Sequence, residues 1–209
     1  NAEAAELIGK GFGTYLRKFQ APNLKFQTNS NDQVPNFKIA VGMDCRTHSP
    51  ELYEAFVNGI LSTGCDVTNI DKCPSPYLYF VNTNGKFDGG CVITASHNPK
   101  EYNGFKLITQ NAHAVFGDEL QKVYQIIEKG EFSIGEGKMI SGDYFDFYLQ
   151  KIKSIFTYSR PSKLVIDTGN GIAGIMYPKI LKALGHEVIE LYQACDGTFP
   201  NHEADPIFE

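Results

Sequence analysis

Apolar and polar positions follow two different periods along the chain. Residues 3–19 place apolar side chains at three- and four-residue spacing, which predicts a helix. Short apolar runs at 37–42 and 89–94 predict buried strands. The same patterns predict further helices at 49–63, 76–82, 118–129, 144–156 and 172–184, and further strands at 66–71, 105–109, 164–166 and 187–191. Strands that alternate with helices indicate an α/β fold with mixed, mostly parallel sheets between helices.

Polar and glycine-rich segments interrupt this alternation. Residues 20–36 are asparagine-rich and bounded by prolines, so they are expected to form a loop. Residues 130–142 are rich in glycine and are expected to be a linker. We therefore predict two domains, at 1–140 and 141–209, the second ending in a loop-like stretch.

Composition narrows the class of protein. With 209 residues, 42% of them hydrophobic, the chain can bury a sizeable core. A net charge of −5 argues against nucleic acid as the main partner. No run approaches the ~18 apolar residues of a membrane span, and the start has no signal-peptide pattern. Five cysteines without a C-x-x-C pair are expected to be free thiols, so we expect a cytoplasmic protein.

The segment 94–106 carries the candidate chemistry. It leaves a predicted buried strand, turns through Asn98-Pro99 and Asn103-Gly104, and returns on a second strand. Ser96 lies near its tip, with His97 beside it and Lys106 on the returning strand. Residue by residue this is an ordinary polar hairpin. A serine on a loop held by a rigid scaffold also suits covalent chemistry.

The order of residues in this segment is more specific than its composition. T-A-S-H-N-P-x-x-Y-N-G-F-K resembles the signature loop of the α-D-phosphohexomutases, in the phosphomannomutase/phosphoglucomutase branch. Other segments resemble the same family in the same order, at 9–16, 41–46, 73–76 and 197–206. The resemblance implies the family's first domain without its opening strand, followed by the beginning of its second domain.

The resemblance also implies an activity. Members of the family move a phosphoryl group between C1 and C6 of a hexose, through a phosphoserine and a hexose 1,6-bisphosphate. Ser96 would be the phosphoserine, and its phosphate would supply one oxygen to Mg²⁺. Lys106 and Arg46 would neutralise the phosphate, and Lys106 is also a candidate general acid–base. His97 would contact the phosphate or hold the loop. Asn98 is grouped with the phosphate- or substrate-binding residues, although its side chain also suits the turn.

Three parts of the family pattern are missing from these 209 residues. The absent parts are a D-G-D-G-D-R-type magnesium loop, a G-E-x-S-G-type sugar loop and a carboxy-terminal phosphate-binding domain. The remaining Mg²⁺ ligands are therefore expected outside this chain. We expect the chain alone to be inactive, with hexose phosphate as the substrate of the whole enzyme.

Two other functions stay open. Residues 169–174 fit G-x-G-x-x-G after a predicted strand, and Glu190 lies near the position of a ribose-binding acid, as in an NAD-dependent oxidoreductase. The same glycines also suit close packing of a helix on a sheet. A non-catalytic sugar-phosphate-binding module is the second alternative.

Overall fold

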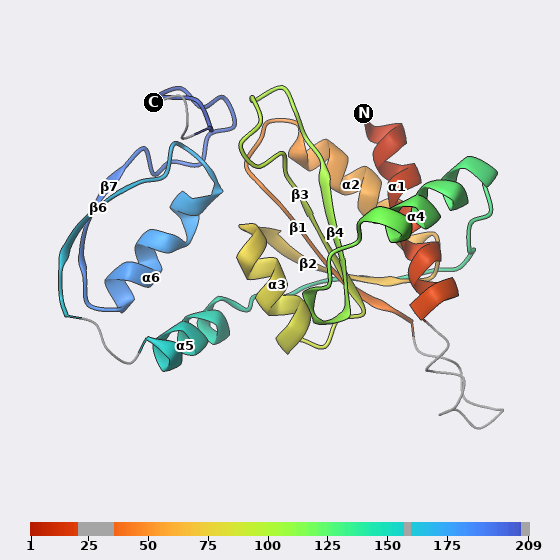
Figure 1. The fold of residues 1–209 in the computed structure, drawn as a ribbon, viewed down its shortest axis with the longest axis horizontal. Coiled ribbons are helices and arrows are strands. Elements are labelled where there is room, and N and C mark those ends of the chain that lie inside the picture. The colour runs from red at the N-terminus through yellow and green to blue at the C-terminus, as the bar shows by residue number, and fades with distance from the viewer. Residues whose placement is uncertain (21–35, 157–159, 206–209) are drawn as a thin grey trace.

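The computed structural model describes residues 1–20, 36–156 and 160–205. The chain forms two sheets, one of five strands and one of two. Figure 1 shows helix α5 (Phe145–Ile155) in the chain between them. We call the part from α1 (Ala2–Tyr15) to β5 (Met139–Ser141) the five-stranded unit, and the part from β6 (Lys163–Asp167) to residue 205 the two-stranded unit. Within the described residues, no helix combines the length and the apolar character needed to cross a bilayer.

The larger sheet has the strand order β4-β3-β1-β2-β5. Its central strand β1 pairs in parallel with β2 and β3, and β5 pairs in parallel with β2. Strand β4 runs antiparallel to β3, which places Lys106 opposite Val92. The predicted mixed, mostly parallel sheet is therefore confirmed. The strand bounds are β1 Lys38–Met43, β2 Asp66–Lys72, β3 Gly89–Ile93, β4 Phe105–Thr109 and β5 Met139–Ser141.

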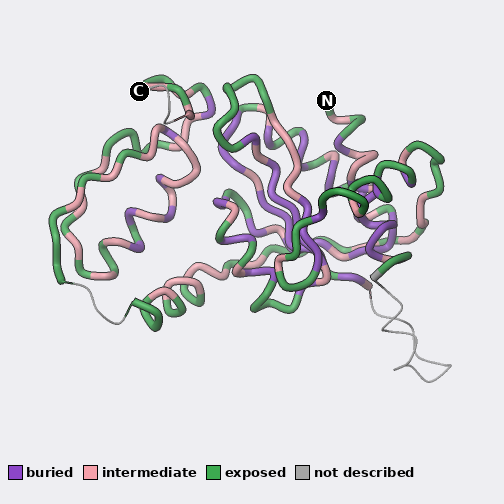
Figure 2. The backbone as a smooth tube through the Cα atoms, in the orientation of Figure 1, coloured by how far each residue is buried: buried purple, intermediate pink, exposed green. Residues whose placement is uncertain are grey.

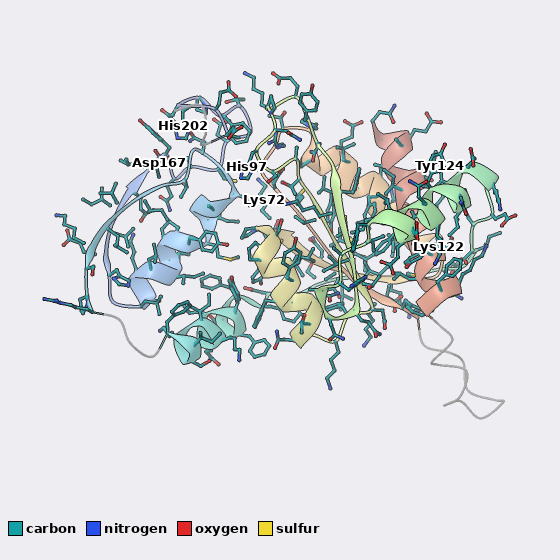
Figure 3. The ribbon with its side chains drawn as sticks, viewed as in Figure 1. Lys72, His97, Lys122, Tyr124, Asp167 and His202 are labelled. Carbon is teal, nitrogen blue, oxygen red and sulfur yellow. The ribbon has the colours of Figure 1, made fainter. Side chains whose placement is uncertain are left out.

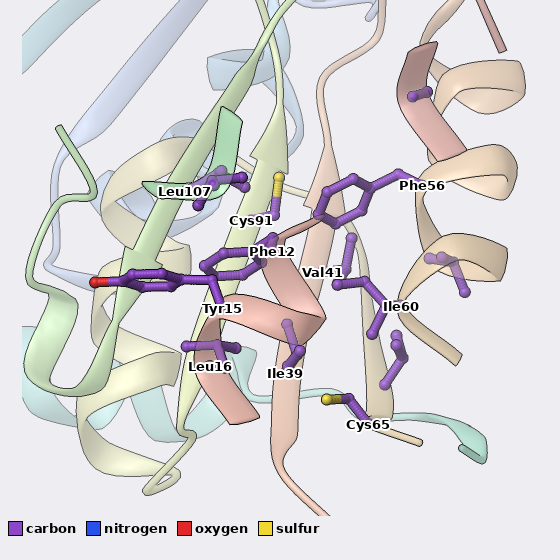
Figure 4. Packing of buried hydrophobic residues seen from close by; sticks show 14 of the residues in the cluster. Phe12, Tyr15, Leu16, Ile39, Val41, Phe56, Ile60, Cys65, Cys91 and Leu107 are labelled. Carbon is purple, nitrogen blue, oxygen red and sulfur yellow. The ribbon is translucent and has the colours of Figure 1, made fainter. Parts of the chain in front are cut away.

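Helices cover both faces of this sheet (Figure 1). On one face lie α1 (Ala2–Tyr15), α2 (Ser49–Leu61) and α4 (Gly117–Lys129), and on the other lies α3 (Ser75–Asn84). Alternate strand residues point to opposite faces. Figure 4 shows the first face, where aromatic and aliphatic side chains of the helices pack on the strands; the labelled residues include Phe12, Ile39, Val41, Phe56, Cys91 and Leu107. Figure 2 shows the resulting burial along these strands.

Two glycines explain how closely α1 and α2 approach each other. A Cβ on Gly9 would lie 2.2 Å from the Phe56 carbonyl oxygen, and one on Gly59 would lie 2.2 Å from the Glu6 carbonyl oxygen. A side chain at either position would force the helices apart, so glycine here serves helix packing.

The smaller sheet consists of β6 (Lys163–Asp167) and β7 (Glu187–Leu191), paired in parallel. Helix α6 (Tyr177–Ala183) connects them. Met176, at the start of α6, and Ile180 join the same apolar cluster as α3. Helix α5 (Phe145–Ile155) packs there too, with ring centroids of Tyr77 and Tyr148 5.4 Å apart. The two units thus meet through the helices that flank α3.

The structure corrects several predicted elements. Strand β5 lies inside the expected linker 130–142; its three exposed residues are too few to produce a periodic signal, and backbone pairing with β2 forms it. The helix predicted at 172–184 is divided into a 3₁₀ turn, Ile172–Ile175, and α6. Close packing of Gly174 on the Gln193 carbonyl accompanies that division. A short π-helical turn, Leu16–Gln20, continues α1, and a 3₁₀ turn, Gln110–Ala112, follows β4. Most of the loop expected at 20–36 lies outside the described residues.

Candidate active site

A cleft of about 470 Å³ lies between the two units. The five-stranded unit lines it with the serine loop (residues 94–104, between β3 and β4), the turn after β1, the segment at the start of α3 and Lys106 of β4. The two-stranded unit lines it with the turn after β6 and with residues 199–204. Figure 3 labels His97 on one side, and Asp167 and His202 on the other. The predicted residues Ser96, His97, Lys106 and Arg46 all line this one cleft.

Ser96 occupies an unusual backbone conformation. Its φ is +56°, in the left-handed region that non-glycine residues seldom adopt. Its N–H donates to Thr94 Oγ1 at 3.1 Å, and its side chain is exposed at the cleft. Such a conformation costs roughly 1–3 kcal/mol and persists only where surrounding contacts hold it. Those contacts are therefore part of the site.

Arg46 supplies the contacts that hold the loop. Its side chain is buried, with Nε donating to Asp44 Oδ2 at 3.2 Å. The two terminal nitrogens donate four hydrogen bonds to carbonyl oxygens of the serine loop: Ser96 at 3.1 Å, Asn98 at 2.7 Å, Pro99 at 2.6 Å and Tyr102 at 3.2 Å. A guanidinium has five N–H donors, so all of them are used. Arg46 lies against the serine loop, and its contacts there are to main-chain oxygens. The phosphate-neutralising role that the family resemblance implies for it stays a prediction.

Asp44 extends this network toward α2. Its Oδ1 accepts from the Arg46 backbone N–H at 3.0 Å and from Ser49 Oγ at 2.6 Å. Ser49 Oγ in turn accepts from Asn103 Nδ2 at 2.8 Å. The turn after β1 that contains Asp44 and Arg46, together with the start of α2, thus holds the serine loop near both of its ends.

Lys106 reaches the cleft from β4. Its neighbours Phe105 and Leu107 pack into the core on the opposite face, as strand alternation predicts. Its Nζ donates to Oγ of Ser75, the first residue of α3, at 3.3 Å. Ser75 belongs to a segment that the family resemblance included, but its contact with Lys106 was missed, because 31 positions separate the two residues.

The other two predicted loop residues have different surroundings. His97 is exposed and lines the cleft. Asn98 is exposed and is not among the cleft-lining residues. Its N–H donates to the Ala95 carbonyl at 3.1 Å, which closes the turn. The substrate-binding role of Asn98 stays a prediction.

The opposite wall carries a carboxylate–imidazole pair that sequence reasoning did not identify as such. His202 Nε2 lies 3.2 Å from Asp167 Oδ1, and its Nδ1 lies 2.8 Å from the Glu203 carbonyl oxygen. An imidazolium satisfies both contacts, because both of its ring nitrogens donate. Partial desolvation alone would raise the pKa of Asp167. Hydrogen bonds from the Gly169 N–H and His202, together with the charge of His202, outweigh that effect and lower it.

The glycine-rich turn after β6 serves the fold of this wall. Buried Asn170 donates from Nδ2 to the Ala194 carbonyl at 2.9 Å and accepts from Asn201 Nδ2 at 2.6 Å. Glu190, the acid of the dinucleotide alternative, forms an ion pair with Lys182 on α6. The regular helix starts only at Tyr177, several residues beyond the glycines. Gly174 has a packing role, because a Cβ there would lie 2.1 Å from the Gln193 carbonyl oxygen. The dinucleotide alternative stays a prediction.

The described residues do not by themselves fit a magnesium centre. They contain no group of three or more His, Cys, Asp or Glu side chains that could hold a metal ion. Mg²⁺ takes oxygen ligands in near-octahedral geometry. A phosphate on Ser96 would contribute one such ligand.

Comparisons with known proteins agree over nearly the whole chain. The model of phosphoglucomutase/phosphomannomutase α/β/α domain I matches residues 1–134, and that of domain II matches residues 143–209. A phosphomannomutase/phosphoglucomutase of Pseudomonas aeruginosa is 36% identical over 168 residues, which are 80% of this chain and 36% of that protein. A phosphoglucomutase of Neisseria meningitidis is 39% identical over 171 residues, 81% of this chain and 37% of that protein.

A solved structure gives the same result. A phosphoglucomutase/phosphomannomutase family protein of Burkholderia thailandensis superimposes with a TM-score of 0.85 at 34% identity, covering 99% of this chain and 43% of that one. The chain spans about two fifths of the length of such relatives, from 36% to 44%.

Proposed function

Since this chain belongs to the phosphoglucomutase/phosphomannomutase family, we propose that it carries the phosphoserine of a hexose-phosphate mutase. Ser96 would hold the phosphoryl group that passes between the C1 and C6 positions of a hexose. The supporting observation is the clamped, left-handed Ser96, whose exposed side chain lines a cleft together with Lys106 and His97. We further propose a hexose phosphate, of mannose or glucose, as substrate and a cytoplasmic location, the latter in keeping with the free cysteines.

Two half-reactions make up the proposed chemistry. In the first, a sugar hydroxyl attacks the phosphorus of phospho-Ser96, the bond to Ser96 Oγ breaks, and a hexose 1,6-bisphosphate forms. In the second, Ser96 Oγ takes the other phosphoryl group and releases the isomeric monophosphate. Phosphoryl transfer depends mainly on positioning and charge neutralisation. When bound, Mg²⁺ would neutralise charge on the transferring phosphoryl group.

The residues of this chain divide those tasks. Lys106, whose Nζ reaches the cleft from β4, is proposed to neutralise the phosphate and to exchange a proton with the sugar hydroxyl. His97 is proposed to contact the phosphate. Arg46 is proposed as a positioning residue, because its side-chain N–H groups donate hydrogen bonds to Asp44 and to carbonyl oxygens of the serine loop. It would favour transfer by holding Ser96 in place.

The proposal is tested by phosphorylation with hexose 1,6-bisphosphate and Mg²⁺ of this chain fused to the remaining domains of a relative such as the Pseudomonas aeruginosa phosphomannomutase/phosphoglucomutase. Intact mass spectrometry is expected to show one added phosphoryl group, which peptide mapping places on Ser96. Ser96→Ala should abolish the addition, whereas Ser75→Ala, a hydroxyl lost from the same cleft, should retain it. Equal labelling of wild type and Ser96→Ala, or no labelling of wild type, would contradict the assignment.

We also propose that the chain alone does not interconvert hexose phosphates, since its described residues lack a metal cluster. A coupled assay for the interconversion of glucose or mannose phosphates is expected to stay at background.

The dinucleotide alternative is tested by titration with NADH, followed by fluorescence. We expect no binding, because Glu190, the acid that would bind the ribose, is paired with Lys182.

A further inference from the structure

We propose that Cys45 and Cys195 form a reversible disulfide that ties the two walls of the cleft together. Cys45 follows β1 in the five-stranded unit, and Cys195 follows β7 in the two-stranded unit. Both are free thiols in this structure. The inference concerns a modification site distinct from Ser96 and does not depend on the proposed mutase activity.

The backbone around Asn170 brings the two cysteines together. Cys45 Sγ donates to the Asn170 carbonyl oxygen at 3.5 Å, and the N–H of Asp196, the residue after Cys195, donates to the same oxygen at 2.9 Å. A Cβ on Gly197 would lie 2.4 Å from the Cys45 carbonyl oxygen and 2.6 Å from Arg46 Cα. The segment 195–197 therefore lies directly on the segment that contains Cys45.

The two thiols differ in pKa and in exposure, as the attacking and the resolving cysteine of a redox pair do. A hydrogen bond with Cys195, together with burial, raises the pKa of Cys45. The same hydrogen bond lowers the pKa of Cys195, and the charge of Lys72 acts in the same direction. Cys195 is also the half-exposed member, while Cys45 is buried. A low pKa and access to solvent make a cysteine the attacking thiolate, and its neighbour then resolves the intermediate.

The oxidant would be a small-molecule disulfide such as oxidised glutathione. The Cys195 thiolate attacks one sulfur of that disulfide, forming a mixed disulfide and releasing one glutathione thiolate. Cys45 then gives its proton to solvent and attacks the Cys195 sulfur, which releases the second glutathione. The protein loses two thiols, and one small disulfide becomes two thiols. Once Cys195 is in the mixed disulfide, its charge no longer raises the pKa of Cys45.

The link would join residues about 150 positions apart and close a long loop of chain, which restricts the unfolded state. It would also fix the spacing of the cleft walls, because Cys45 lines the cleft and directly precedes the loop clamp Arg46. Oxidation is therefore expected to raise the unfolding temperature. It is also expected to slow exchange of ligands that need the cleft to open.

The test is to incubate the chain with oxidised glutathione and count thiols under denaturing conditions. Wild type is expected to lose two of its five thiols. Peptide mapping should recover a Cys45–Cys195 link that dithiothreitol reverses. Cys195→Ser should form neither the link nor the more heat-stable species, and circular dichroism would verify its fold.

Cys73→Ala is the matched control, because Cys73 is another buried thiol and lines the cleft as Cys45 does. This variant should still form the link. The proposal is overturned if wild type loses no thiols, if glutathione stays attached to Cys195, or if the recovered link joins Cys195 to Cys73. It is also overturned if Cys195→Ser loses two thiols as wild type does.

Discussion

The two sheets that flank the cleft differ in how they are buried. All five residues of β3 are buried, whereas those of β6 alternate between exposed and half-buried. Val41 on β1 is 0% exposed and Val165 on β6 is 63% exposed. Helices cover both faces of the first sheet, while on the second Val165, Ile189 and Leu191 face outward. One wall of the cleft therefore rests on a closed core, and the other depends on α5 and α6 where they meet α3.

The charged groups of the two walls follow the same division. Arg46 and Asp44 form a buried pair in which every guanidinium N–H is donated. Asp167 and His202 form a pair with 40% and 27% of their side chains exposed. Buried pairs are costly to break, and exposed pairs contribute little. The serine loop is thus held more firmly than the opposite wall, which suits a cleft with one fixed side.

The largest expected effect follows from removing the loop clamp. Arg46→Ala should lower the free energy of unfolding by about 3–5 kcal/mol, because Asp44 would remain as a buried charge without its partner. Arg46→Lys should recover only part of the loss, since an ammonium has three donors and no planar fork. Urea denaturation measures both, and limited proteolysis of the loop should accelerate in parallel.

Arg17→Ala is the control for the loss of an arginine. Arg17 donates one hydrogen bond, from Nη1 to the Gly64 carbonyl, so its removal should cost only about 1 kcal/mol. Similar losses of unfolding free energy for Arg46→Ala and Arg17→Ala would mean that the buried Asp44–Arg46 network stabilises the chain no more than a single hydrogen bond does.

A smaller effect comes from one substitution made in both sheets. Val41→Ala should lower the free energy of unfolding by about 2 kcal/mol, through lost apolar burial and the cavity that remains. Val165→Ala should change it by less than about 0.5 kcal/mol, as for other surface substitutions. The midpoints of urea denaturation, analysed with a common m-value, give the two changes in unfolding free energy. A loss at Val165 equal to that at Val41 would show that the outer face of β6 is covered in solution.

Much of this fold follows from sequence periodicity. The α/β class and the alternation of helices and strands in the five-stranded unit are confirmed, because strands buried on both faces form continuous apolar runs. Strand β5 was missed because its exposed residues carry no apolar period. The helix predicted at 172–184 was too long, because residues 172–175, with Gly174 packed on Gln193, form a 3₁₀ turn before α6. Periodicity finds elements that bury a face, and it does not find those formed by backbone pairing at an edge.

The site was only partly accessible from sequence. The serine loop is local, so one segment sufficed to identify Ser96, His97 and Lys106. The clamp joins Arg46 to carbonyls about fifty positions later, and His202 meets Asp167 across 35 positions. Every residue has a main-chain carbonyl oxygen, so the residue types do not indicate which carbonyls accept hydrogen bonds from Arg46. The sequence pointed to a charge-neutralising arginine, and its contacts with the loop carbonyls became visible only in three dimensions.

The smallest expected effect concerns pH and the exposed wall. The pKa of Asp167 is lower in the folded chain than in an unfolded one, where Asp titrates near 3.9. Its contribution is therefore fully present above about pH 4–5 and is lost as pH falls through the folded pKa. Asp167→Asn should cost about 0.5 kcal/mol or less at pH 7, because the pair is exposed, and less again near pH 3. Urea denaturation of wild type and Asp167→Asn at pH 7 and pH 3 measures the difference in unfolding free energy, which should narrow in acid.

Asp196→Asn is the control for an aspartate without the His202 contact. The pKa of the Asp196 carboxylate is also lowered, by hydrogen bonds from the Thr198 N–H and hydroxyl. A gap for Asp167→Asn that widens in acid would contradict the assigned sign, and a gap of several kcal/mol would mean that this wall is held as firmly as the serine loop.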